Sequence, residues 1–311
     1  MGRYAIPELI AGLKARDWRV LGRAITMVEN NADGKEALMD YACANAREDG
    51  LILGITGAGG AGKSTLIDKL VQIYLKEEKR VGILSVDPSS PFTGGALLGD
   101  RIRMGGCTPS AEVYMRSFAS RGAYGGISQG AKDALYLYKA FGFDVIIIES
   151  LGVGQAETDI SAFADVTAVV LAPGNGDGIQ LAKAGTQEIA DLYVINKGDK
   201  PEAGALRLQI LSALEAVPED RRPAVVTASA TGNQGIDTLV EGIDSAAKKF
   251  GHLRKMKRRA RIENEIYTSV LRHLEEPIKK RTRVLLTDVL EGKCTPHGAA
   301  ALLAAKIKIE D

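Results

Sequence analysis

Residues 51–64 read LILGITGAGGAGKS, and this stretch decides the fold. Its first six residues are mostly apolar without polar alternation, as in a parallel strand whose two faces are covered by helices. The last eight fit the pattern G-x-x-x-x-G-K-S of a phosphate-binding loop, and the helix-like segment TLIDKLVQIYLK follows. A glycine-rich turn that only starts a helix is the alternative. The order of strand, loop and helix favours the phosphate-binding loop.

Glycines in such a loop let backbone N–H groups approach phosphate oxygens, and the helix N-terminus adds a partial positive charge. Lys63 is expected to reach the β- and γ-phosphates, and the Ser64 hydroxyl is expected to bind Mg²⁺. Ala58 stands where ATPases that dimerise around their nucleotide carry a second lysine, which argues against that mechanism. The predicted phosphate-binding residues are Gly57, Ala58, Gly59, Gly60, Ala61, Gly62, Lys63, Ser64 and Thr65.

Short apolar runs alternate with helical segments from residue 51 onward. This alternation predicts an α/β fold with a doubly wound, mostly parallel sheet, whose ligands bind at the C-terminal ends of the strands. The expected strands are 51–56, 81–87, 113–117, 145–150, 166–171, 192–196 and 225–227.

The sequence 196–199, NKGD, follows the apolar run LYVI and predicts the base. In N-K-x-D the aspartate accepts hydrogen bonds from guanine N1–H and N2–H₂, donors that adenine lacks on that edge. An unpaired buried carboxylate is costly, so GTP is favoured over ATP. An ordinary turn is the alternative, but Ser229-Ala230 beyond the next strand resembles the loop behind guanine O6 in GTPases. The predicted base-binding residues are Asn196, Lys197, Asp199, Ser229 and Ala230.

Carboxylates after two other strands predict a Mg²⁺ site with Ser64. Asp87 ends one apolar run, Glu149 ends another, and Asp100 lies thirteen residues after Asp87. Mg²⁺ prefers such hard oxygen ligands, bound directly or through water. For Asp100 alone, a solvent-exposed loop acid is the favoured alternative. Glu149 opens E-S-L-G, where related GTPases have D-x-x-G, so Gly152 is expected to contact the γ-phosphate.

Hydrolysis is expected to be slow. Many GTPases place a water-positioning Gln directly after the D-x-x-G glycine, and here that residue is Val153. Gln155 could substitute, although a plain turn residue is an equally open alternative. The predicted catalytic residues are Lys63, Asp100, Glu149 and Gln155, and a partner is expected to accelerate turnover by reordering switch loops. The Gly-rich segment 172–180 is interpreted as an additional switch.

The charge and composition of the chain limit the kinds of partner that we expect. Formal net charge is +1, which marks neither nucleic acid nor membrane as a partner. No apolar run approaches the ~18 residues of a membrane span, and no signal peptide is evident. The basic run 254–261 lacks interleaved aromatics and precedes two glutamates, so a solvated helical face or an acidic protein is favoured over nucleic acid. Widely spaced cysteines fit a cytoplasmic location.

Helical spacing of apolar residues marks both ends of the chain. It occurs before residue 48 and again after residue 250, where Ile262, Ile266, Val270 and Leu274 form a stripe that must bury against something. We therefore expect an N-terminal helical extension at 1–48, a P-loop GTPase domain at 49–250 and a C-terminal helical arm at 251–311. Trp18, the single tryptophan, is expected to be a packing residue.

Six long motifs, in order, resemble the MeaB-type GTPases, also labelled ArgK, the chaperones of adenosylcobalamin-dependent methylmalonyl-CoA mutase. They are GITGAGGAGKSTLIDKL, SVDPSSPFTGGALLGDRIRM, MRSFASRGAYGG, IIIESLGVGQAETDI, APGNGDGIQLAKAG and VINKGDK. The resemblance implies a homodimer built through the C-terminal arm. It also implies a GTP/GDP cycle that gates adenosylcobalamin loading and protects or reactivates the mutase. Asp177 and Lys183 would belong to a third switch that responds to the mutase.

Other functions stay open beside this one. The mutase could be a relative that acts on isobutyryl-CoA or 2-hydroxyisobutyryl-CoA. A protein kinase linked to amino-acid transport would need an acceptor-site base, and no segment offers a clear one. A nickel-type metallochaperone GTPase would carry a His-rich tract or a Cys-Pro-x-Cys switch, and the sequence around Cys107 is not one.

Overall fold

The computed structural model describes residues 5–87, 112–119, 127–150, 156–174 and 189–305. The chain divides into two compact units, residues 1–254 and 255–311. Each unit is described by itself below.

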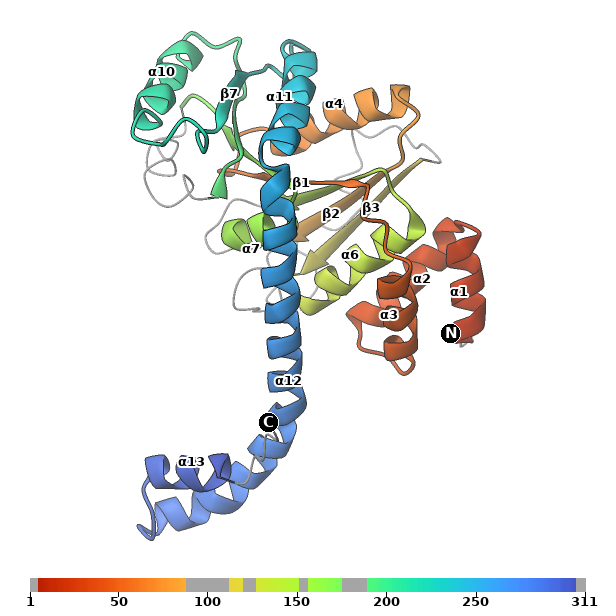
Figure 1. Cartoon of the computed structure of the whole chain (residues 1–311), viewed down its shortest axis with the longest axis vertical. Coiled ribbons are helices and arrows are strands. Elements are labelled where there is room, and N and C mark those ends of the chain that lie inside the picture. The colour runs from red at the N-terminus through yellow and green to blue at the C-terminus, as the bar shows by residue number, and fades with distance from the viewer. Residues whose placement is uncertain (1–4, 88–111, 120–126, 151–155, 175–188, 306–311) are drawn as a thin grey trace. The chain divides into compact units, whose positions relative to one another are not determined.

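The first unit is built on one seven-stranded sheet in which every neighbouring pair of strands is parallel. The strand order is β3-β2-β4-β1-β5-β6-β7, which confirms the doubly wound α/β fold (Figure 1). The strands are β1 (Leu51–Thr56), β2 (Val81–Asp87), β3 (Val113–Ala119), β4 (Val145–Ser150), β5 (Val166–Leu171), β6 (Leu192–Ile195) and β7 (Ala224–Thr227).

Two strands end at residues other than those expected, and a third, β7, starts at Ala224 rather than at residue 225. β3 continues to Ala119, because Phe118 and Ala119 pair with the last residues of β2. β6 stops at Ile195, because Asn196 leaves the sheet and turns its side chain toward the 57–64 loop. Both of these strand ends lie at the carboxyl edge, where the backbone leaves the sheet to form loops.

Helices cover both faces of the sheet. α4 (Lys63–Lys76) and α11 (Ile236–Lys249) pack on one face in a shared apolar core. α6 (Gln129–Phe141) and α7 (Ala156–Phe163) pack on the other (Figure 1). α10 (Ala203–Ala213) covers that second face near β6. Because both faces are buried, β4 and β5 contain a buried residue at every position.

The N-terminal helices α1 (Ile6–Lys14), α2 (Trp18–Glu29) and α3 (Lys35–Ala44) pack against α6 and join its core. The Trp18 ring lies 4.9 Å from the Phe141 ring, 5.6 Å from Phe143 and 5.9 Å from Tyr114, measured between centroids. Trp18 is therefore a packing residue, as expected. Ion pairs across this contact join Lys35 to Asp133 at 2.7 Å, Glu29 to Arg116 at 3.3 Å and Glu48 to Lys139 at 3.0 Å.

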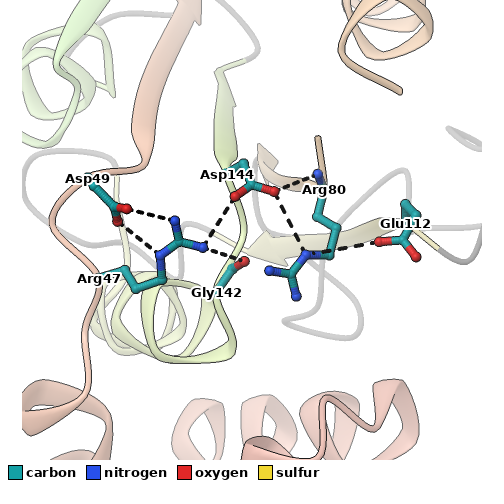
Figure 2. A network of polar contacts seen from close by, with 6 residues as sticks. All are labelled: Arg47, Asp49, Arg80, Glu112, Gly142 and Asp144. Atoms are coloured by element: carbon teal, nitrogen blue, oxygen red, sulfur yellow. Dashed lines mark hydrogen bonds and ion pairs between the residues drawn. The ribbon is translucent and has the colours of Figure 1, made fainter. Parts of the chain in front are cut away.

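A polar network fastens the amino edge of the sheet (Figure 2). Arg47 binds both carboxylate oxygens of Asp49, at 2.9 and 2.7 Å, and donates to Asp144 Oδ1 at 3.2 Å. Asp144 Oδ2 accepts from the Arg80 backbone N–H at 2.9 Å. Asp144 thus joins the residues that enter β1, β2 and β4. The hydrogen bond from Arg47 to Asp49 raises the arginine pKa, whereas burial lowers the pKa of Arg80.

The second unit contains most of α12 (Gly251–Leu290) and α13 (Pro296–Ala304). Much of the apolar stripe expected on this arm is exposed: Ile262 is 38% exposed, Ile266 62% and Val270 52%. The neighbouring Tyr267 is 62% exposed as well. Within the part of the chain that the structure describes, no helix combines the length and apolar character needed to cross a bilayer.

Candidate nucleotide site

The loop between β1 and α4 needs its glycines. Gly57 has φ +137°, and a Cβ atom there would collide with the carbonyl oxygen of Val170 in β5. Gly62 has φ +88°, and a Cβ atom there would collide with the side-chain amide of Asn196. Larger residues at either position would push the loop away from the sheet. This loop therefore lies closely against β5 and against the segment that follows β6.

Lys63 is the first residue of α4, and its side chain turns back into the loop. Its Nζ donates to the carbonyl oxygens of Gly57, at 2.6 Å, and Ala58, at 3.0 Å, and the residue is only 6% exposed. These contacts hold a positive charge within the turn of the loop, where the sequence predicts phosphate binding.

The expected metal ligand Glu149 lies at the carboxyl edge of β4 and is 2% exposed. Two hydroxyl groups donate to its carboxylate. Ser64 Oγ donates to Oε1 at 2.7 Å, and Ser85 Oγ, from β2, donates to Oε2 at 3.1 Å. The sequence predicted Ser64 and Glu149 to act together, and the structure brings them into direct contact.

This donor set fits Mg²⁺. A serine hydroxyl and a carboxylate are hard oxygen ligands, and they lie beside the lysine expected to contact phosphate. The backbone of Asp87 ends β2 at the same edge, but its side chain is outside the described residues, as is all of Asp100. Among the described residues, no group of three or more His, Cys, Asp or Glu could by itself hold a metal ion.

Asn196 connects three loops. Its Nδ2 donates to the Ala61 carbonyl at 2.8 Å, and its Oδ1 accepts from the Ala230 backbone N–H at 3.2 Å. The sequence placed Asn196 among the guanine-binding residues. In the structure both ends of its amide are bound to the protein, so its contribution is to hold the phosphate-binding loop and the Ser229-Ala230 segment in place.

Lys197, the residue after Asn196, also contacts the phosphate-binding loop. It has φ +57°, and its Nζ donates to the Gly60 carbonyl at 2.7 Å. The left-handed backbone turns the chain sharply after β6, and the next residue, Gly198, donates its N–H to the Ala228 carbonyl at 2.9 Å. The NKGD segment is thus held to both neighbouring loops.

Asp199, in the segment that follows β6, is exposed and forms a hydrogen bond with Ser229. The Ser229 hydroxyl donates to Asp199 Oδ1 and accepts from the Gly232 backbone N–H at 3.1 Å. The hydrogen bond from Ser229, reinforced by a backbone N–H, lowers the pKa of Asp199. The carboxylate is therefore kept ionised, the form that accepts hydrogen bonds from a guanine edge.

Several predicted residues lie outside the described residues: Asp100, Gly152, Val153, Gln155, Asp177 and Lys183. The sequence reading, in turn, missed two contacts. One is Ser85 on Glu149. The other joins Thr56 Oγ1 to Ser150 Oγ at 2.8 Å, both fully buried, and links the strand before the phosphate-binding loop to the strand before Gly152. Hydroxyl residues at the ends of otherwise apolar strands were the available signal.

Comparison with known proteins identifies the family. The profile described as methylmalonyl Co-A mutase-associated GTPase MeaB matches residues 21–283. The chain belongs to the MeaB family. The GTPase ArgK of Escherichia coli, strain K12, is 34% identical over 327 residues, covering 98% of this chain and 97% of its own. A MeaB-family assignment therefore spans both the phosphate-binding and the base-binding segments.

Two further relatives extend the comparison. A fused isobutyryl-CoA mutase of Geobacillus kaustophilus, strain HTA426, is 39% identical over 263 residues, which cover 79% of this chain and 24% of that protein. The crystal structure of a LAO/AO transport system kinase superposes with a TM-score of 0.70 at 26% identity and covers 98% of both chains. The MeaB family is a GTPase family, so guanine-nucleotide binding and hydrolysis follow for this chain in general terms.

Proposed function

We propose that this MeaB-family protein is a GTP-hydrolysing chaperone of a B12-dependent acyl-CoA mutase. It would gate adenosylcobalamin loading and protect or reactivate the enzyme. The observation that carries the proposal is the family match, whose description names methylmalonyl-CoA mutase. The fused isobutyryl-CoA mutase supports it, because there a homologous segment belongs to the same polypeptide as a mutase.

The geometry of the site supports a Mg²⁺-GTP cycle. Lys63 would bind the phosphates, Asp199 would accept from the guanine edge, and Ser64 and Glu149 would hold the ion. When bound, Mg²⁺ would neutralise charge on the phosphate oxygens. Glu149 would orient the groups bound at the carboxyl edge of β4. Lys63 would offset negative charge at the γ-phosphate. Asp100 and Gln155 remain predicted catalytic residues.

The exposed stripe of α12 supports a homodimer. Ile266, Tyr267 and Val270 lie at helical spacing with more than half of each side chain exposed. Burial of such a stripe against a second copy would remove apolar area from water, at about 25 cal/mol per Å². A polar partner would gain little from this surface.

The decisive test measures GTP turnover with and without a purified acyl-CoA mutase. We expect slow turnover alone and at least a tenfold increase with the cognate mutase, a barrier change of ~1.4 kcal/mol. The stimulation should disappear in Lys63→Ala, which removes the charge held in the loop. Methylmalonyl-CoA and isobutyryl-CoA mutases should be compared, because one of them should stimulate more strongly.

The same assay with γ-labelled GTP separates the alternatives. Release of free phosphate supports the chaperone, whereas transfer of label to a protein would support the kinase reading. Absence of stimulation by every acyl-CoA mutase tested would contradict the proposal. Micromolar Ni²⁺ binding by the purified protein would instead favour the metallochaperone reading.

A further inference from the structure

Ser85 is a hydroxyl residue within the apolar run of β2. It is fully buried in β2, between the neighbouring strands β3 and β4. In the β2–β4 pair its Cα lies directly opposite that of Glu149. A hydroxyl buried in an apolar strand costs free energy unless it forms a hydrogen bond, and Ser85 Oγ donates to Glu149 Oε2 at 3.1 Å.

We propose that Ser85 is a positioning residue that fixes the Glu149 carboxylate for Mg²⁺-dependent nucleotide binding and hydrolysis. This inference rests on the proposed role of Ser64 and Glu149 in holding Mg²⁺. Groups that orient a metal-binding carboxylate affect metal affinity about 10- to 100-fold, although they do not touch the metal. Ser85 is placed to have such an effect.

The two hydroxyls on Glu149 have different surroundings, and this difference carries the inference. Ser64 lies in the first turn of α4, next to Lys63, where its hydroxyl is expected to bind the ion and so to exchange its hydrogen bond with Oε1. Ser85 is enclosed in the sheet and far from the phosphate-binding loop in the chain. Its contact with Oε2 therefore stays when Ser64 turns to the ion.

Loss of Ser85 should consequently be felt only when Mg²⁺ is present. Without the ion, Ser64 still donates to Glu149 and keeps the carboxylate in place. With the ion, the carboxylate of a Ser85→Ala protein would lack the hydroxyl donor that β2 supplies to Oε2. A purely structural role of Ser85 would instead weaken nucleotide binding equally with and without Mg²⁺.

The experiment titrates Mg²⁺ against binding of a fluorescent GDP or GTP analogue to full-length wild-type and Ser85→Ala proteins. We expect unchanged affinity in EDTA, about a tenfold higher Mg²⁺ concentration at half-saturation, and a lower kcat with little change in KM. Thr167→Val is the matched control. It also removes a fully buried hydroxyl from the sheet, and among the described residues that hydroxyl has no hydrogen-bond partner.

A second pair of variants keeps the test decisive. Ser85→Cys retains the size of the side chain with a weaker donor, so its Mg²⁺ half-saturation should lie between those of wild type and Ser85→Ala. It also replaces the alanine variant if that protein does not fold. In a Glu149→Gln background, Ser85→Ala should cause no further change, because the group that Ser85 positions has already been altered.

The outcomes separate the two proposals. If the wild type binds nucleotide independently of Mg²⁺, the proposed metal role of Ser64 and Glu149 fails. If the wild type depends on Mg²⁺ but both Ser85 variants titrate like it, only the positioning role of Ser85 fails. Equal weakening in EDTA and in Mg²⁺ likewise overturns the positioning role.

Discussion

The Asn196 side chain donates from Nδ2 to the Ala61 carbonyl oxygen at 2.8 Å, which joins the segment after β6 to the phosphate-binding loop. The same amide accepts from the Ala230 backbone N–H. One side chain therefore couples the phosphate half of the nucleotide site to the base half.

Asn196→Ala should weaken GDP and GTP alike. It leaves the Ala61 carbonyl and the Ala230 N–H without their partner, at a cost of about 1–3 kcal/mol for each unsatisfied group. Isothermal titration should show at least a tenfold loss of affinity for both nucleotides. A variant that binds both as tightly as the wild type would refute the coupling.

Asp199→Asn should change the base preference. The amide presents a donor where the carboxylate presents an acceptor, so guanine should bind worse and xanthine, which carries an oxygen at the 2-position, should bind better. Competition between GDP and xanthosine diphosphate measures the change, with Lys200→Ala as a neighbouring charge control. An unaltered ratio would remove Asp199 from base recognition.

Ser229→Ala should make binding more sensitive to acid. The Ser229 hydroxyl lowers the pKa of Asp199, so the ionised, binding-competent form persists below the ordinary carboxyl range and is lost only as pH falls through the lowered value. Without Ser229, the pKa of Asp199 should move back toward that of an ordinary aspartate, so the carboxyl should become protonated at a higher pH than in wild type. The ratio of GDP affinities at pH 4 and pH 7 should therefore fall further in Ser229→Ala than in wild type.

Two buried tyrosines offer a matched comparison of stability. The Tyr138 hydroxyl donates to the Ile83 carbonyl at 3.1 Å, whereas the Tyr74 hydroxyl has no hydrogen-bond partner among the described residues. Tyr138→Phe should lower the free energy of unfolding by about 1 kcal/mol. Tyr74→Phe should leave it unchanged or raise it by up to ~1 kcal/mol. Urea unfolding followed by circular dichroism would measure both, and equal effects would contradict the contrast.

Alkaline pH should affect the stability of Tyr74→Phe and of the wild type differently. Burial raises the pKa of Tyr74 well above its ordinary value. The neutral tyrosine therefore favours the folded state, and this contribution is present below about pH 10 and is lost as pH rises further. Tyr74→Phe should accordingly lose less stability than wild type between pH 9 and 11.

Trp18→Ala should destabilise the first unit by about 3–5 kcal/mol, because it empties the centre of the cluster formed with Tyr114, Phe141 and Phe143. Trp18→Phe, which keeps a ring there, should cost less than half as much. Trp18 is the only tryptophan, so its fluorescence reports the contact of α2 with this cluster. In wild type, fluorescence and circular dichroism should show the same urea midpoint if α2 unfolds together with the sheet.

The strands were largely predictable because their burial leaves a local signature. The run from Leu51 to Thr56 is mostly apolar, and its bounds agree with β1. The end of β3 was missed because Phe118 and Ala119 are held by pairing with β2, a contact distant in sequence. The docking of Trp18 against Phe141 was equally invisible, because helical spacing shows which face is buried and not what covers it.

The site divides in the same way. The phosphate-binding loop and the NKGD segment could be predicted from the sequence, because glycine geometry and guanine recognition each require particular residues within a short span. The contacts of Asn196 could not be predicted from the sequence, because its partners Ala61 and Ala230 contribute backbone groups, which no sequence pattern identifies. Ser85 had one usable signal, a lone hydroxyl in the apolar run that ends at Asp87, but only the strand order places it opposite Glu149.

The central position of β1 in the sheet determines when this strand can pair during synthesis of the chain. Leu51 pairs with Val145 of β4, and Leu53 pairs with Val166 of β5, so β1 has no sheet neighbour until the ribosome has made nearly half of the chain. Gly57 reaches its shape against Val170. A nascent chain that carries the complete GAGGAGKS sequence therefore lacks the β5 backbone against which this loop lies until Val170 has been translated, and until then its apolar strands depend on protection from aggregation.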